Sequence, residues 1–247
     1  MKSYSIANLS LIIITALLSI LPLTAQAEEQ AEYSPYINDK FPNNVYFGDT
    51  HLHTSYSADA GFVGTTLDPE DAYRFARGEE VTSSTGVRAK LQRPLDFLVV
   101  SDHAENLGLA PLAAAGDPAI LATEFGRKIH DLMKADKGAE AFDLWRASRA
   151  SGVDPMAGDN EAAQTVWDKI IDAAEKYNDP GLFTAFIGYE WTSVPGGNNL
   201  HRNIIYRDGK AKAEKILPFS AYDSEDVEDL WSWMDTVSYT HLTLPTS

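Results

Sequence analysis

Short apolar segments alternate with helix-forming segments along this chain, and this alternation most limits the fold. Strand-like segments begin at Val45, Pro94, Phe183 and His201. Helical patterns fill residues 68–77, 117–148, 161–177 and 224–234, and residues 79–92 read as a loop or short hairpin. Strands that alternate with helices favour an α/β fold with a parallel sheet or barrel, whose functional groups collect at the carboxyl ends of the strands. We therefore expect the site where these strands end.

The first strand carries a histidine pair, His51 and His53, preceded by Asp49. Side chains alternate between the two faces of a strand, so these three residues are predicted to share one face. Imidazole nitrogens bind Zn, Mn or Fe, and Asp49 could accept a hydrogen bond that orients one ring. For an isolated pair, two half-buried structural histidines would explain the pattern equally well.

Three later residues strengthen the metal interpretation. His103 closes the second strand, Glu190 lies near the end of the third, and His201 begins the fourth. Asp102 should point away from His103 and is predicted to support it or to cap the backbone. Ser101 and His103 lack the third group that a serine nucleophile needs. We therefore predict a metal site of histidines and a carboxylate.

The composition limits the classes of molecule that this protein can bind. The formal net charge is −16, which argues against nonspecific binding to nucleic acid or anionic membranes. Cysteine is absent, so a metal would rest on His, Asp and Glu. We expect a small, anionic substrate that is attracted by metal ions. Arg202 and Arg207 are candidates to bind its oxygens, although the sequence favours a surface ion pair for each.

The N-terminus has the pattern of a secretory signal peptide over residues 1–27. Lys2 precedes an apolar stretch from Leu9 to Leu23, and an A-x-A site ends at Ala27. Cleavage after Ala27 would give a periplasmic or secreted protein without stable membrane association. The alternative is an uncleaved anchor, but the stretch is shorter than the ~20 residues of a membrane span. Residues 28–43 form a polar lead-in.

The motifs together resemble those of the polymerase and histidinol phosphatase (PHP) superfamily. They are Asp49-Thr50-His51-Leu52-His53-Thr54, Ser101-Asp102-His103, Gly188-Tyr189-Glu190 and His201. With Tyr46-Phe47-Gly48 and the residues that flank the later motifs, they resemble its exported branch, known as domain of unknown function 3604. The resemblance covers about residues 44–233.

Membership would imply a distorted (β/α)7 barrel that holds two or three divalent ions, Zn, Mn or Fe, and hydrolyses phosphate esters. A water activated by metal would then be the nucleophile, rather than a side chain. The resemblance implies that Glu190 bridges the ions, and Asp59 falls about one position from a family ligand. The implied metal ligands are His51, His53, Asp59, His103, Glu190 and His201.

The C-terminal residues 237–247 resemble the translated frame of a transposase adapter, and we exclude them from fold reasoning. The family closes its site with a later His and a terminal Asp-x-His, and the residues between His201 and Thr236 supply neither. The resemblance therefore implies a partial barrel, truncated at the C-terminus, with an incomplete metal site and little activity of its own.

Two other functions fit the same residues. Multinuclear sites of this kind also hydrolyse amides, sulfates or lactones, because a fold does not fix a substrate. A noncatalytic periplasmic binding protein could instead use the metals structurally, with closed coordination. We expect a metal-dependent hydrolase, most specifically a phosphoesterase.

Overall fold

The structure is a computed structural model that describes residues 44–156, 160–237 and 241–245. The chain divides into two units, Met1–Val45 and Tyr46–Ser247, and the helices and strands of the described residues all belong to the second. The predicted signal peptide and lead-in, residues 1–43, lie outside the described residues. Among the residues described, no helix has the length and apolar character that crossing a membrane requires.

The second unit contains a three-stranded parallel sheet, as the alternation predicts. Its order is β1-β4-β5, with β1 at Gly48–Leu52, β4 at Phe97–Val100 and β5 at Thr184–Phe186. Parallel strands need long crossover connections, and here helices supply them. The pairing of β1 with β4 shifts register between Asp49 and Leu52. His51 lies within this irregular stretch, and His53 follows it.

The predicted third strand is broken at Ile187 into β5 and β6 (Gly188–Ser193). The backbone carbonyl of Ile187 instead accepts a hydrogen bond from Tyr206. Strand β6 pairs antiparallel with β7 (Leu200–Tyr206), because only a short loop that contains the 3-10 helix η1 (Pro195–Gly197) joins them. A purely parallel arrangement is therefore not found.

Backbone hydrogen bonds connect the parallel sheet with β6. The Glu190 N–H donates to the Asp102 carbonyl at 3.0 Å, and the Ala104 N–H donates to the Glu190 carbonyl at 2.7 Å. His103 and Glu190 form an isolated parallel bridge. The segment that follows β4 is thereby held alongside the middle of β6.

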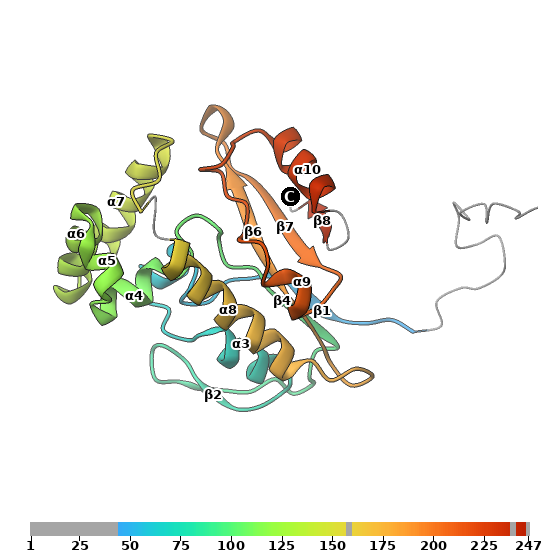
Figure 1. Ribbon diagram of the computed structural model, residues 1–247. Helices are drawn as coiled ribbons and strands as arrows, with labels where there is room; N and C mark the ends of the chain where they lie inside the picture. The colour runs from blue at the N-terminus through green and yellow to red at the C-terminus, as the bar shows by residue number, and fades with distance from the viewer. Residues whose placement is uncertain (1–43, 157–159, 238–240, 246–247) are drawn as a thin grey trace, which may run out of the picture. The chain divides into compact units, whose positions relative to one another are not determined.

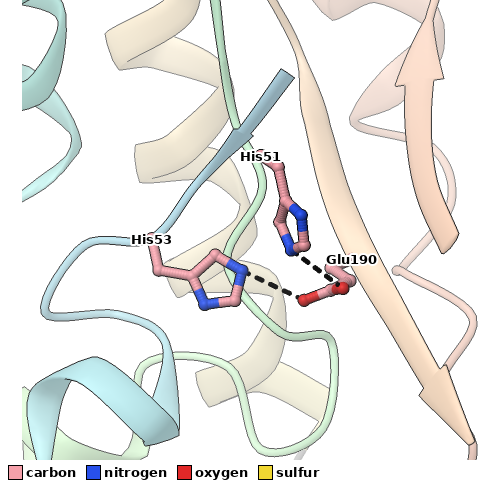
Figure 2. A group of neighbouring side chains, drawn as sticks. All are labelled: His51, His53 and Glu190. Carbon is pink, nitrogen blue, oxygen red and sulfur yellow. Dashed lines mark ion pairs between the residues drawn. The ribbon is translucent and has the colours of Figure 1, made fainter. Parts of the chain in front are cut away.

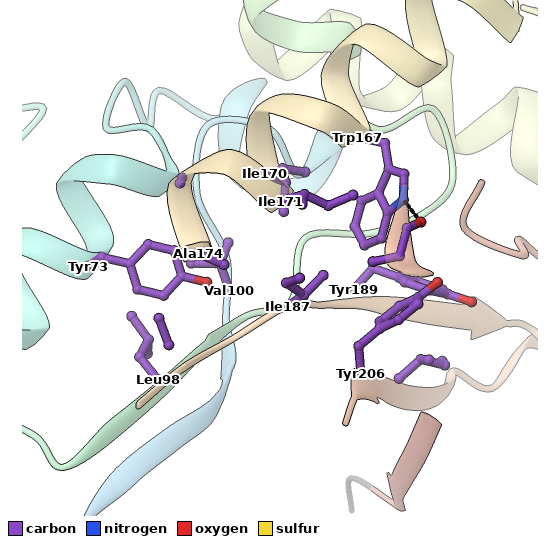
Figure 3. Packing of buried hydrophobic residues seen from close by; sticks show 14 of the residues in the cluster. Tyr73, Leu98, Val100, Trp167, Ile170, Ile171, Ala174, Ile187, Tyr189 and Tyr206 are labelled. Atoms are coloured by element: carbon purple, nitrogen blue, oxygen red, sulfur yellow. Dashed lines mark hydrogen bonds between the residues drawn. The ribbon is translucent and has the colours of Figure 1, made fainter. Parts of the chain in front are cut away.

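Two helices pack on one face of these strands and form the main core. Asp68 caps α3 (Pro69–Ala76) by accepting the Asp71 N–H, which confirms the predicted helix start. Helix α8 (Asn160–Tyr177) buries Trp167, Ile170 and Ile171 against the strands (Figure 3). The Trp167 indole N–H donates to the Ala213 carbonyl, so its polar atom is satisfied within the core.

A second apolar cluster lies among the helices of the middle of the chain (Figure 1). These helices are α2 (Ala58–Gly61), α4 (Leu109–Ala115), α5 (Pro118–Ala122), α6 (Glu124–Lys134) and α7 (Gly138–Ala150). The predicted helical segment 117–148 is thus three helices. Thr123 ends α5 and caps α6 by accepting the Gly126 N–H, which explains the first break.

The remaining elements are short. A hairpin joins β2 (Val81–Thr82) to β3 (Arg88–Ala89), α9 spans Lys210–Ala213, and α10 spans Val227–Thr236. Strand β8 (His241–Pro245) pairs antiparallel with β7. It falls within residues 237–247, whose foreign origin stays a prediction.

The described residues therefore form a mixed α/β structure with three small sheets, and their strands do not close into a barrel. The α/β class is confirmed. Sequence reasoning missed α4, whose ends are set by glycines with positive φ, Gly108 and Gly116.

Replacing Leu98 with alanine should destabilise the protein by about 2–5 kcal/mol, because this fully buried side chain of β4 would leave a cavity in the main core. Leu182→Ala is the matched control, because Leu182 is 78% exposed. Urea unfolding of both variants measures the difference. Equal losses would contradict the assignment of the core.

Candidate metal centre

The carboxylate of Glu190 is the centre of the site. Its partner in the β6–β7 register is Asn203, and the residue is fully buried. Strand alternation sends its neighbours Tyr189 and Trp191 into the core beneath α8, so Glu190 faces the opposite side of the strand. Sequence reasoning placed Glu190 near a strand end, whereas it lies in the middle of β6.

Strand β1 brings both histidines of the predicted pair to this carboxylate. His51 Nε2 lies 3.1 Å from Glu190 Oε1, and His53 Nε2 lies 3.0 Å from Glu190 Oε2 (Figure 2). The His51 side chain is 36% exposed, whereas that of His53 is 16% exposed. His51 therefore lies on the open side of the site.

Two further histidines complete the ring around Glu190. His103 Nδ1 lies 3.3 Å from Glu190 Oε2, and His201 Nδ1 lies 2.7 Å from Glu190 Oε1. His103 follows β4, and His201 is opposite Thr192 in the β6–β7 register. The structure thus gathers around one carboxylate four histidines from three distant parts of the sequence.

Asp59 lies beside His53 and His103, on the short helix α2, and its side chain is 38% exposed. Its Oδ1 accepts from His53 Nδ1 at 3.0 Å, and its Oδ2 lies 3.6 Å from His103 Nε2. Ser57, which sequence reasoning missed, donates to Asp59 Oδ1 at 2.6 Å and accepts the His103 N–H at 3.1 Å. The local sequence offers one signal for this role: Ser57 lies in a turn, two residues before Asp59, where a serine hydroxyl can bond a nearby side chain or backbone.

Asp49 and Asp102 both hold backbone near the histidines. Asp102 is buried and accepts from the Thr54 N–H and, at 2.6 Å, from the Thr54 hydroxyl, which fixes the chain directly after His53. Asp49 accepts the His51 N–H at 2.8 Å. Asp49 therefore contacts the backbone of His51, whereas the sequence suggested that it orients an imidazole ring.

The two arginines predicted to bind substrate are placed differently from the histidines. Arg202 pairs with Trp191 in the register, on the strand face opposite His201, and donates to the His201 carbonyl at 2.7 Å. Arg207 is exposed and follows the last residue of β7. His130 is also apart from the site, since its Nδ1 lies 2.7 Å from the Ala113 carbonyl.

Three polar residues that the sequence did not reveal support the site. Asn203 donates to the Thr50 carbonyl at 2.6 Å and so ties β7 to β1. Glu105 is fully buried beside His103, and the buried Arg149 of α7 lies 4.0 Å from Glu105. The bonds of Asn203 and Glu105 join segments at least 87 residues apart, so no local pattern could indicate them.

The donor atoms fit divalent metals. Solvent-inaccessible atoms without a hydrogen-bond partner include His53 Nε2, His103 Nδ1 and both oxygens of Glu190. Buried polar atoms are nearly always bonded in native proteins, so these converging atoms call for a further partner. Three overlapping groups have ligand atoms within 4.8 Å of one another: His51 with His53 and Glu190, His53 with Asp59 and His103, and His103 with Glu190 and His201. Imidazole and carboxylate donors suit Zn, Mn or Fe.

The site lies within a region that matches a known family. The family model described as "Protein of unknown function (DUF3604)" matches residues 40–244. The chain belongs to the DUF3604 family. The match includes every residue around Glu190 described above, so the candidate metal centre is part of the DUF3604 region. Neither a curated protein nor a solved structure matches the chain.

The charges of this DUF3604 site are strongly coupled. Burial lowers the pKa of His53, but Asp59 and Glu190 outweigh burial and raise it to about 9. Burial opposes the charge of His103 too, and Asp59, Glu105 and Glu190 raise its pKa to about 10. Burial raises the pKa of Glu190, and the surrounding histidines bring it below its usual value. The pKa of Asp59 is lowered in the same way, whereas burial raises that of Asp102 to about 6 against its bonds to Thr54.

These shifts predict how the metal-free DUF3604 protein depends on pH. Because the folded-state pKa values of His53 and His103 lie above 6.5, their stabilisation is complete below about pH 6.5 and is lost as the pH rises through 9 and 10. The free energy of unfolding should fall by up to about 1.4 kcal/mol per pH unit for each histidine. Urea unfolding of chelator-treated protein between pH 6.5 and 9 measures this fall.

In the variant His53→Gln, the free energy of unfolding should depend less on pH, because one of the two histidines with a raised pKa is removed. His130→Gln should keep the full dependence, since His130 lies outside the ring around Glu190. A free energy of unfolding that is constant across this pH range would contradict the coupling.

Proposed function

We propose that this DUF3604 protein is a metal-dependent hydrolase that acts on phosphate esters. The observation that supports the proposal is the buried Glu190 carboxylate, which four imidazoles approach. Both of its oxygens, together with His53 Nε2 and His103 Nδ1, lack a hydrogen-bond partner. Burying the negative charge of Glu190 costs free energy unless a positive charge lies nearby. Two or three divalent ions, Zn, Mn or Fe, would provide that charge.

The side chains would divide the work of holding these ions. Glu190 offers one oxygen toward His51 and His201 and the other toward His53 and His103, which suits a bridging carboxylate. Asp102 and Asn203 fix the backbone next to these ligands, since Asp102 accepts from the Thr54 N–H and Asn203 donates to the Thr50 carbonyl. When bound, the ions would supply Lewis acidity and make water nucleophilic near neutral pH.

The implied ligands differ in exposure. The side chains of Asp59, His51 and His201 are 38%, 36% and 29% exposed, whereas those of His53 and His103 are 16% and 7% exposed. A substrate would therefore approach past the three more exposed side chains. The net charge of −16 repels anions, so a phosphate ester would depend on the metal charge for binding.

The resemblance of the motifs to the PHP superfamily supports phosphate esters over amides, sulfates or lactones. We also propose that the strands belong to a distorted PHP-type barrel, because the bridge between His103 and Glu190 joins the parallel sheet to β6. The leader-like residues 1–27 support export to the periplasm or the outside of the cell.

The proposal predicts metal-dependent hydrolysis by the purified protein. Metal analysis should find divalent ions, and turnover of p-nitrophenyl phosphate or bis-p-nitrophenyl phosphate should be lost on chelation and restored by metal. Glu190→Gln should lower kcat/KM by about 100-fold or more, because even residues that only support ligands are worth 10–100-fold. His130→Gln is the matched control and should keep full activity.

Other outcomes would separate the alternatives. Turnover of an amide, sulfate or lactone substrate alone would change the substrate class. Metal without turnover of any class would favour a noncatalytic binding protein. Protein that neither retains nor takes up metal would contradict the proposal as a whole.

A further inference from the structure

Glu105 is a buried carboxylate that the proposed metal ligation does not use. The residue is fully buried, two positions after His103. Its Oε1 accepts the Ala221 N–H at 2.8 Å and the Thr192 N–H at 3.3 Å. These two bonds fix the orientation of the carboxylate and leave Oε2 to face elsewhere.

The other oxygen, Oε2, faces His103. Glu105 Oε2 lies 3.5 Å from His103 Nδ1, and neither atom has a hydrogen-bond partner. A buried carboxylate oxygen without a donor is costly, because it has lost its hydrogen bonds to water and gained none in return. The ring N–H of His103 is the donor that lies nearest to satisfying it.

The surroundings of His103 favour this donor over the alternative. Nδ1 also lies 3.3 Å from Glu190 Oε2, but the Glu190 carboxylate already faces three other imidazoles. The opposite ring atom, Nε2, lies 3.6 Å from Asp59 Oδ2, within the group of His53, Asp59 and His103 that could hold a metal. The two nitrogens of His103 therefore face different groups: Nδ1 faces Glu105 and Glu190, and Nε2 faces Asp59.

We infer that Glu105 is a positioning residue that accepts the Nδ1 proton of His103 and so reserves Nε2 for a metal beside Asp59. The inference rests on the proposed function, since it assumes that the site binds metal. A carboxylate behind a ligating histidine fixes the tautomer and makes the free nitrogen a stronger ligand.

Arg149 of α7 lies near the other oxygen of Glu105. Its Nη1 lies 4.0 Å from Glu105 Oε1, and its Nη2 donates to the Thr192 carbonyl at 2.5 Å. The guanidinium also lies over the Tyr222 ring at 5.2 Å. A buried charge needs an opposite charge nearby, and Arg149 provides it from the side away from His103.

The test compares zinc affinity in two variants of the purified protein. Glu105→Gln can keep an acceptor for Thr192 and Ala221 but turns an amide N–H₂ toward His103 Nδ1. Asp223→Ala is the control, because Asp223 anchors the same loop by accepting from the Ser220 N–H and hydroxyl but does not contact His103. Competition with a chromophoric chelator should show about 10–100-fold weaker zinc binding in Glu105→Gln. Asp223→Ala should stay within about threefold of the wild type by this reasoning.

A second measurement uses the wild-type protein and so does not depend on the folding of a variant. Long-range ¹H–¹⁵N spectra of the zinc-bound protein, assigned with His103→Gln, show which nitrogen of His103 carries the proton. The inference expects a protonated Nδ1. A protonated Nε2, or unchanged zinc affinity in Glu105→Gln, would overturn it.

The same titration separates this inference from the proposed function. If the wild type binds zinc and Glu105→Gln binds it equally well, only the role of Glu105 fails. If the wild type binds no zinc, the proposed function fails and this inference fails with it.

Discussion

The burial of the Glu190 carboxylate is the constraint on which the site depends. A carboxylate removed from water must be matched by positive charge and by donors. Four imidazoles meet that demand from three parts of the chain: one from β1 and one directly after it, one from the segment after β4 and one from β7. The residues that balance this charge are the same residues whose nitrogen and oxygen atoms suit a divalent metal. Folding and the candidate chemistry therefore depend on one group.

The position of Glu190 follows from the pleat of β6. Tyr189 and Trp191 on either side of it are buried beneath α8, and alternation leaves Glu190 on the opposite face. The histidines reach that face because polar side chains tie the backbones together. Asp102 holds Thr54, and Asn203 holds the Thr50 carbonyl. The main core thus fixes one face of the strands, and side-chain hydrogen bonds arrange the other.

Sequence reasoning identified most residues around Glu190 because they stand in short local patterns. His51 and His53 form a pair at the end of one strand, and His103, Glu190 and His201 lie in or beside other strands, whereas Asp59 was implied only by the resemblance to the PHP motifs. Ser57, Glu105 and Arg149 were not found, because their roles depend on contacts between distant segments, such as that of Glu105 with Ala221. Likewise, the break at Ile187 and the antiparallel turn into β7 depend on pairing, which the apolar run 183–192 does not reveal. Helix starts such as Asp68 were predictable, since a cap acts within its own turn.

The most direct test of a metal centre at Glu190 is X-ray diffraction from crystals of the purified protein soaked in zinc, with data collected on both sides of the zinc absorption edge. The account predicts anomalous difference peaks between the Glu190 carboxylate and the surrounding imidazoles, with at least one peak within bonding distance of Glu190, about 2.0–2.2 Å. A map without such peaks, with Glu190 bonded directly to protonated histidines, would contradict the account.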